Sequence, residues 1–213
     1  MTNGAASKPR LSRAETKDNT HRALLDAAET CFLNFGYQGA TLDAIAAEAG
    51  FTKGAVYSHF SSKEALFVEL LAEGMRRNSQ DAERILTLLS EKPELLDDEL
   101  GSWIDEFDAH NNVPLLALEM DMESRRSPSF AALLGAVVAK QQNEVSRYLA
   151  RYFEAVGRDS PLPVEELASV MIALSKAVAL ARQTRHSHEL NSAKVMRLLL
   201  GMPVARSARK TQR

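Results

Sequence analysis

The side chains best suited to recognition chemistry lie within one short stretch of the chain. Lys53, Tyr57 and His59 carry hydrogen-bond donors there, spread over about two helical turns. This combination adds little to a short helix, but it suits hydrogen bonds to phosphate oxygens and base edges. Gly54 costs about 1 kcal/mol relative to alanine in a helix interior, yet it leaves room for a phosphate; tolerance near a helix end would also explain it. The stretch therefore favours contact with a nucleic acid.

Patterns of catalysis and metal binding were sought in the same sequence. It contains no Walker or Rossmann glycine pattern, no nucleophile elbow and no His-Glu-x-x-His helix, which disfavours an enzyme. His186, His188 and Glu189 could hold a metal together with His110, but such a group is more often a solvated loop. We therefore expect no catalytic residues, no metal and no cofactor.

Two short helices joined by a tight turn are predicted around the recognition stretch. Apolar residues recur at helical spacing over residues 42–49, and Gly50 is a natural stop. Thr52 is suited to cap a further helix from about Lys53 to His59. Two such helices with a three-residue turn form a helix-turn-helix, which presents its second helix to the major groove of DNA. The positions expected to face inward are Phe32, Ile45, Val56 and Phe60.

The remaining sequence is also helical in pattern, so we expect an all-α protein. A helix from about 17 to 35 should end at Gly36, and Ser61 to Glu64 has the spacing of a capping box for a fourth helix. Further helices are expected near 80–90, 94–110, 114–124, 128–156, 163–185 and 191–200.

Composition and charge limit the class of protein. A hydrophobic share of 45% and a charged share of 25% are ordinary for a globular chain. Residues 1–63 hold 7 Lys or Arg against 6 Asp or Glu, residues 64–204 hold 15 against 22, and residues 205–213 hold 4 against none. This distribution allows DNA contact at one end of the chain. No signal peptide or membrane-spanning stretch is apparent, so a cytoplasmic protein without a membrane partner is expected.

Residues from about 17 to 71 closely resemble the DNA-binding domain of the TetR (tetracycline repressor) family. Where that family often has Val-Ser after the glycine of the turn, this chain has Phe51-Thr52, which keeps the capping hydroxyl. Beyond Met75 the resemblance is limited to length and helical character. The residues that carry it are Thr41, Ile45, Ala46, Ala49, Gly50, Thr52, Lys53, Gly54, Val56, Tyr57, His59, Phe60, Lys63 and Leu66.

The resemblance implies contacts with the DNA backbone at four positions. Thr41, at the start of the second helix, is expected to bind a phosphate through its hydroxyl and backbone N–H. Tyr57 and His59 are expected on phosphates, with a core histidine as the alternative for His59. Lys63 is expected to reach a phosphate from the start of the fourth helix.

Base contacts are expected from the start of the recognition helix, with Lys53 on a guanine edge. The residues placed deepest in the groove are Thr52, Lys53, Gly54 and Ala55. The resemblance also implies a homodimer on a double-stranded DNA operator, with recognition helices roughly 35 Å apart.

Two C-terminal helices form the dimer interface in the family. Apolar stripes suited to that role are present here, although packing within one subunit explains them equally well. In 163–185 the stripe comprises Val164, Leu167, Met171, Leu174, Val178 and Ala181, beside the small residues Ala168, Ala173 and Ala177. In the last helix it comprises Val195, Met196, Leu199 and Leu200.

The middle helices could enclose a small-molecule effector. Glu119 and Asp121 would then select a cationic ligand, and the alternative is that they pair internally with Arg125 and Arg126. Core packing is the alternative for each aromatic or methionine candidate. The candidates for ligand binding are Trp103, Phe107, His110, Glu119, Met122, Phe130 and Met171.

These expectations divide the chain into four parts. A basic leader covers 1–16, a three-helix helix-turn-helix domain 17–63, a helical bundle for ligand binding and dimerisation 64–203, and a basic tail 204–213. The expected function is a repressor released from a palindromic operator by its effector. The alternative is an architectural or protein-regulated DNA-binding factor without a small-molecule ligand.

Overall fold

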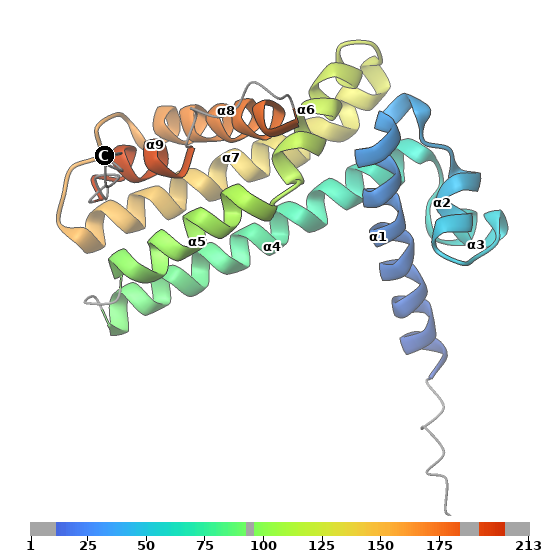
Figure 1. The fold of residues 1–213 in the computed structure, drawn as a ribbon, viewed down its shortest axis with the longest axis horizontal. Coiled ribbons are helices and arrows are strands. Elements are labelled where there is room, and N and C mark those ends of the chain that lie inside the picture. The colour runs from blue at the N-terminus through green and yellow to red at the C-terminus, as the bar shows by residue number, and fades with distance from the viewer. Residues whose placement is uncertain (1–11, 93–95, 184–191, 203–213) are drawn as a thin grey trace, which may run out of the picture. The chain divides into compact units, whose positions relative to one another are not determined.

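The computed structural model describes residues 12–92, 96–183 and 192–202, and these residues form helices without any strand. The expected all-α class is thereby confirmed. The chain divides into two compact units, one reaching Leu70 and the other starting at Leu71. In chain order the helices are α1 (Arg13–Gly39), α2 (Leu42–Glu48), α3 (Lys53–His59), α4 (Lys63–Glu91), α5 (Leu96–His110), α6 (Val113–Ser124), α7 (Pro128–Val156), α8 (Val164–Gln183) and α9 (Ser192–Leu199) (Figure 1).

In the N-terminal unit, α1 begins four residues before the expected start at 17. Ser12 and Glu15 form a capping box there, in which the Ser12 hydroxyl accepts the Glu15 N–H at 3.1 Å and the Glu15 carboxylate accepts the Ser12 N–H at 2.7 Å. These reciprocal bonds satisfy two helix-end donors and fix the first turn. The stop predicted at Gly36 is a kink with φ of 68°, after which one further turn reaches Gly39.

Three stacked rings form the centre of this unit. The ring of Phe67, from α4, lies 4.4 Å from the ring of Phe32 and 5.1 Å from that of Tyr37 between ring centroids. Ile45 and Val56, from α2 and α3, are also fully buried, as their positions in the sequence predicted. The first two turns of α4 therefore complete the core on which the helix-turn-helix rests.

α4 is one continuous helix, and the expectation of a separate helix near 80–90 was wrong. Within this helix, Gly74 lies in close contact with Val113, where a β-carbon would not fit. Its packing against α6 outweighs its low helix propensity. The cap of α4 also lies one residue later than expected, because the Ser62 hydroxyl accepts the Ala65 N–H at 3.1 Å.

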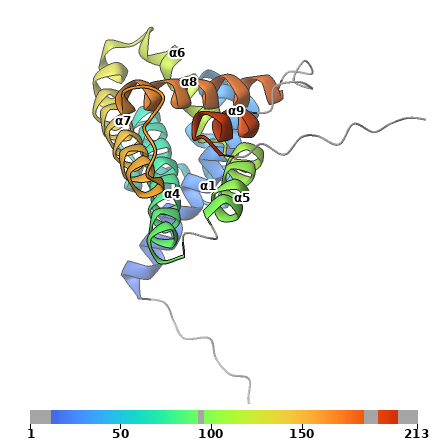
Figure 2. The ribbon, with the colours of Figure 1, turned by 90° about the vertical axis from the view of Figure 1, so that its left-hand side faces the viewer.

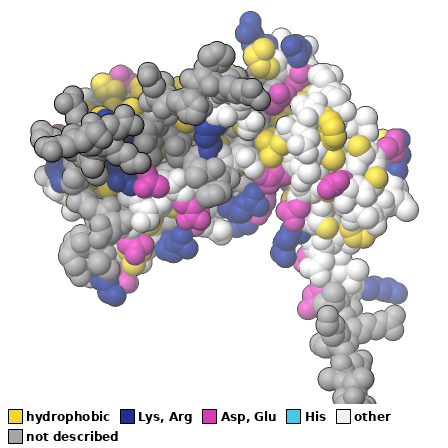
Figure 3. All heavy atoms as spheres, viewed as in Figure 1, with side chains coloured by type: hydrophobic (Ala, Val, Ile, Leu, Met, Phe, Trp, Pro, Cys, Tyr) yellow, Lys and Arg dark blue, Asp and Glu magenta, His cyan; other side chains and the backbone are white. Residues whose placement is uncertain are grey.

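The C-terminal unit packs α5 to α9 with the remainder of α4 around a second core (Figure 2). α9 is tied to α5 by Arg197, which donates to the carbonyl of Gly101 at 2.8 Å and to Asp105 at 2.6 Å. α7 is tied to the residue after α9 by the Tyr152 hydroxyl, which donates to the carbonyl of Leu200 at 3.0 Å. On the outside, acidic and basic side chains are interspersed over this unit (Figure 3).

Candidate functional site

The turn between α2 and α3 is built by local hydrogen bonds. The N–H of Phe51 donates to the carbonyl of Ala46 at 2.8 Å, and the N–H of Gly50 donates to that of Ala47 at 3.1 Å. This pair of bonds is a Schellman motif, which needs a left-handed residue just past the helix. Gly50 supplies it, with φ of 72°. The helix-turn-helix predicted from the sequence is therefore present, with its turn where it was expected.

Threonine hydroxyls cap both helices of the motif. Thr41 accepts the N–H of Ala44 at 3.1 Å, and Thr52 accepts the N–H of Ala55 at 3.3 Å. Both threonines are exposed. Because a hydroxyl can accept one bond and donate another, each cap keeps its proton free for a phosphate oxygen. The exposed N-termini of α2 and α3 are thus suited to bind anions.

Lys53, expected on a guanine edge, is paired with an acidic residue of α2. Its Nζ lies 2.8 Å from the carboxylate of Asp43, and both side chains are more than half exposed. The hydrogen bond to Asp43, and then its charge, raise the pKa of Lys53. Such an exposed pair contributes only about 0.2–1 kcal/mol, so Lys53 can exchange this partner for a base. Asp43 was not singled out in the sequence, because nothing in the pattern shows that the first turns of α2 and α3 meet.

The other polar positions of α3 differ in exposure. Tyr57 is exposed, whereas His59 is half buried beside His21, with 5.5 Å between ring centroids. Burial, followed by the charges of His21 and Lys17, lowers the pKa of His59. A neutral imidazole keeps one N–H donor, so His59 serves both the packing and the surface. His21, whose Nε2 lies 2.8 Å from the carboxylate of Glu69, escaped the sequence reasoning because its position in α1 matches no motif.

Lys63 is occupied within the protein. Its Nζ donates to the carbonyl of Tyr37 at 2.7 Å and to that of Ala40 at 3.0 Å, and it lies 4.3 Å from the centre of the Tyr37 ring. These contacts hold the segment that links α1 to α2, immediately before Thr41. They use two of the three N–H donors of the ammonium group, so the expected contact of Lys63 with a phosphate stays a prediction.

Replacing Lys63 with methionine should lower the free energy of unfolding by about 1–2 kcal/mol. The reason is the loss of two charge-assisted hydrogen bonds to the carbonyls of Tyr37 and Ala40. Urea denaturation followed by far-UV circular dichroism would measure this. Lys17→Met, at an exposed position of α1, is the matched control and should change little. A value for Lys63→Met no larger than that of the control would contradict the assigned role.

A cavity of about 170 Å³ lies within the C-terminal unit. Its lining comes from α4, α5, α7, α8 and the region of α9, which surround one interior in Figure 2. The residues contributed by α4 are Met75, Asn78, Ser79, Ala82, Ile85 and Leu86.

The ligand-binding candidates from the sequence divide into two groups. Trp103, Phe107 and Met171 line the cavity together. Glu119, Met122 and Phe130 do not: Met122 is largely exposed, Phe130 is buried elsewhere in the unit, and Glu119 is half buried. A helical repeat alone could not separate these residues, because it does not show which neighbouring helix each apolar side chain meets. The side chain of His110, and residues His186, His188 and Glu189, lie outside the described residues.

The two faces of α8 have different surroundings from those expected. Leu167 and Val178 of the predicted interface stripe, and the small residue Ala168 beside it, are buried in the unit's own core. The opposite face exposes Val170, Ala173, Ala177 and Leu180 at spacings of three and four residues. On neighbouring α7, Leu133 and Val138 are exposed as well. The intramolecular explanation therefore accounts for the predicted stripe, and a second apolar face remains on the surface.

One of the two acidic residues considered for cation binding has a partner on another helix. Asp121 accepts from Lys176 at 2.6 Å, and Arg126, considered as an internal partner, donates to the buried Glu123 at 2.7 Å. These contacts lie outside the lining of the cavity.

None of the helices in the described part of the chain is both long and apolar enough to cross a membrane.

Known proteins share both parts of this architecture. Residues 24–70 match the model of the family "Bacterial regulatory proteins, tetR family". The HTH-type transcriptional repressor AcnR of Corynebacterium efficiens is 26% identical over 70% of this chain and 74% of its own length. AcnR of Corynebacterium glutamicum is 30% identical over 62% of this chain and 61% of its own length.

Two solved structures share the fold over most of both chains. FadR of Bacillus subtilis, in complex with stearoyl-CoA, has a TM-score of 0.61 and 17% identity, and the alignment covers 85% of this chain and 96% of FadR. The fatty acid degradation regulator FadR of Bacillus halodurans has a TM-score of 0.62 and 16% identity, with 91% and 95% covered. Residues 24–70, which include the helix-turn-helix, therefore match the DNA-binding domain of the TetR family, and the chain as a whole is similar to transcriptional regulators of that family.

Proposed function

We propose that the protein is a dimeric repressor that binds a palindromic DNA operator and is released from it by a small-molecule effector. The observation that carries this proposal is α4, a single helix that belongs to both units. Its residues Leu66, Phe67 and Leu70 are buried in the N-terminal unit, and its residues from Met75 to Leu86 line the cavity. The curated relatives named AcnR are repressors, and one structural neighbour was solved with stearoyl-CoA.

The DNA contacts are proposed to come from the exposed ends and face of the helix-turn-helix. Thr41 and Tyr57 bind phosphates, and His59 does so with its remaining N–H. Lys63 holds the segment before Thr41 in place with two N–H donors and keeps the third for a phosphate. The residues proposed to approach the bases are Thr52, Lys53, Gly54 and Ala55, whose position at the start of α3 suits entry into the major groove.

The homodimer is proposed to form through the exposed apolar face of α7 and α8. Leu133, Val138, Val170 and Leu180 are large apolar side chains that are exposed on these two helices. A contiguous apolar face on a monomer is a typical mark of an interface. A twofold assembly through one such face would present two recognition helices to the two halves of a palindrome.

Release requires that the effector prefer the conformation that does not bind DNA. A ligand shifts an equilibrium only by the ratio of its affinities for the two states. A molecule that changes the packing of α4 around the cavity also changes the position of the helix that completes the core of the N-terminal unit. Ligand binding and operator binding are then coupled through α4, and each weakens the other.

Selection of bound sequences from random double-stranded DNA tests the proposal. The expected result is one palindromic consensus with half-sites about one helical turn apart, bound with an affinity that falls steeply with salt. Recovery of many unrelated sequences, with no palindrome, would instead support an architectural factor. The consensus also supplies the operator needed for every measurement of effector release.

Two variants separate base reading from phosphate binding. Lys53→Ala should reduce the difference in binding free energy between operator and scrambled DNA by about 1–3 kcal/mol, which is the usual value of a specific base contact. Tyr57→Phe should weaken binding to both DNAs equally, because it removes one phosphate contact. Fluorescence anisotropy with both DNAs measures these effects. Equal loss of discrimination in the two variants would contradict the division of roles.

A further inference from the structure

The cavity in the C-terminal unit has an uncharged lining. Of the 20 described residues around it, not one is Asp, Glu, Lys, Arg or His. A ligand carrying a charge would lose its hydration there without gaining a counter-charge, which is strongly unfavourable. The lining therefore selects against anions and cations alike.

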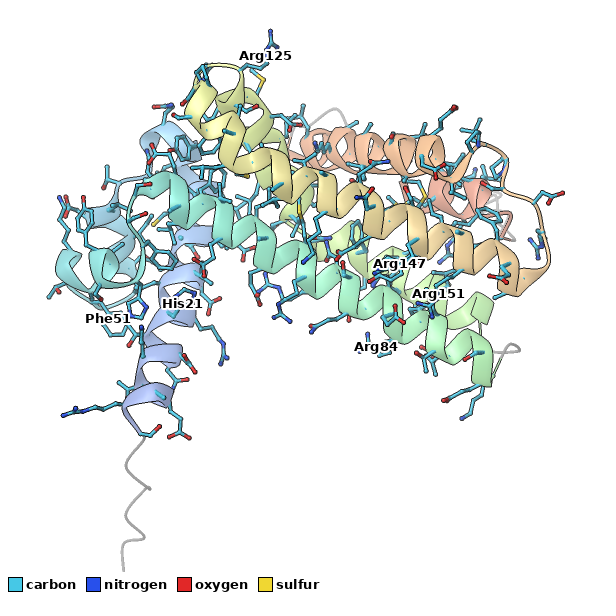
Figure 4. All side chains as sticks on the ribbon, turned by 180° about the vertical axis from the view of Figure 1, so that it is seen from behind. His21, Phe51, Arg84, Arg125, Arg147 and Arg151 are labelled. Atoms are coloured by element: carbon cyan, nitrogen blue, oxygen red, sulfur yellow. The ribbon has the colours of Figure 1, made fainter. Side chains whose placement is uncertain are left out.

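The carboxylate of Glu144 lies behind the lining and accepts from Ser79 at 2.6 Å, and three arginines of α4 and α7 do not supply a partner for a charged ligand. Arg151 is bonded to Glu83 at 2.7 Å, between α7 and α4. Arg84, Arg147 and Arg151 are all exposed, and they lie on the side of the unit seen in Figure 4. These guanidinium groups remain in solvent, outside the lining.

Neutral hydrogen-bonding groups are present in the lining and are of two kinds. Some are used inside the protein: Ser79 donates to Glu144 at 2.6 Å and Ser175 donates to the carbonyl of Ile172 at 2.8 Å. The amides of Asn78 and Gln141 and the hydroxyl of Tyr148, in contrast, have no hydrogen-bond partner among the described residues. Two amides and one phenol are thus available to a ligand.

Size and shape narrow the ligand further. A dry protein cavity of about 150 Å³ accepts benzene, and this one measures about 170 Å³. Its apolar lining includes the rings of Trp103 and Phe107, 5.2 Å apart between centroids, together with those of Tyr148 and Tyr152. Aromatic side chains pack well against flat rings in offset or tilted arrangements.

We infer that the effector is an uncharged, mainly aromatic molecule of one or two rings, bearing a neutral hydroxyl, carbonyl or amide group. The rings fill the apolar part of the cavity, and the neutral group bonds to Asn78, Gln141 or Tyr148. This inference rests on the proposed effector function of the cavity, and it names the chemistry that the cavity selects.

A matched series on one ring system tests the inference. The full-length protein is titrated by calorimetry at neutral pH with 2-naphthol, naphthalene, 2-naphthoate and 2-naphthylmethylammonium. We expect 2-naphthol to bind at least about tenfold more tightly than either charged compound, and more tightly than naphthalene. Equal or tighter binding of a charged compound, or no binding by any member of the series, would overturn the inference.

Variants locate the site and its polar contacts. Ala82→Phe, which fills the cavity from α4, should abolish binding of naphthalene and 2-naphthol, while circular dichroism checks that the protein is folded. Asn78→Leu combined with Gln141→Leu should bring the affinity for 2-naphthol down to that for naphthalene. Asn143→Leu, at an exposed position two residues along α7, is the control. If the double variant keeps the preference for 2-naphthol, the assignment of the polar contacts is wrong.

Operator binding measured in parallel keeps the two proposals distinct. If 2-naphthol binds as expected but leaves operator affinity unchanged, the effector function fails and the ligand class stands. If only a charged compound releases the operator, the ligand class fails and the effector function stands.

Discussion

Glutamate at both Val170 and Leu180 should leave the protein monomeric and lower its affinity for a palindromic operator by about 10²–10⁴-fold, the advantage that two linked binding sites have over one. Both side chains are exposed on the same face of α8. In a dimer through this face, four carboxylates would be buried against apolar surface, which is strongly unfavourable. Sedimentation velocity measures the assembly, and fluorescence anisotropy with operator DNA measures the affinity.

A matched pair of single variants makes this result specific. Leu180 is 47% exposed on α8, and Leu162 is 39% exposed in the segment before α8. Leu180→Glu should weaken the dimer, whereas Leu162→Glu should leave it intact. A stable dimer in the double variant at micromolar concentration would show that the interface lies on another face.

The second large effect is expected from Phe67→Ala, which should reduce the stability of the N-terminal unit by about 3–5 kcal/mol. Phe67 is fully buried between the rings of Phe32 and Tyr37, and alanine would leave a cavity at the centre of the unit. The loss is a large part of the 5–15 kcal/mol typical of a whole domain. Hydrogen exchange of the amides in α1 and α3 would measure it as lost protection, and operator binding should fall with it.

Two internal controls accompany that measurement. Trp103, the sole tryptophan of the chain, lies in the C-terminal unit, so its fluorescence reports the unfolding of that unit separately. The midpoint of this transition should lie at nearly the same denaturant concentration in Phe67→Ala as in the parent protein. Phe35→Ala, on the 62% exposed Phe35 of α1, should change stability by no more than about 0.5 kcal/mol. A similar effect of Phe35→Ala and Phe67→Ala would mean that the ring stack does not support the unit.

Both effects bear on the coupling carried by α4. Phe67 lies on the part of α4 that completes the core of the N-terminal unit, and Ala82 lies on the part that lines the cavity. A change at either place acts on one continuous helix. The proposed switch therefore requires no separate signalling element, only two positions of α4 with different affinities for effector and DNA.

The sequence by itself determined the helix-turn-helix, because every interaction that defines it is local. The caps at Thr41 and Thr52 bond to groups three residues away, and the Gly50 turn closes over five residues. Local bonds leave their mark as residue types at fixed spacing. The same reasoning found three residues of the cavity lining, Trp103, Phe107 and Met171.

Only the tertiary structure decided which face of each later helix turns inward. α8 is apolar on more than one face: its periodicity favoured Leu167 and Val178 for the interface, yet these are buried in the unit and Val170 and Leu180 are exposed. The choice depends on what the neighbouring helices bury, and such packing acts between residues far apart in the sequence.

The partners of the polar groups were also decided at the tertiary level. Lys63 bonds to carbonyls more than 20 residues away, and Asp43 reaches Lys53 across the turn. Hydrogen bonds of this kind depend on the distance between atoms in the folded chain and leave no periodic pattern. For that reason the sequence could identify the helix-turn-helix, while the structure was needed to show that Lys63 also holds the segment before Thr41 in place.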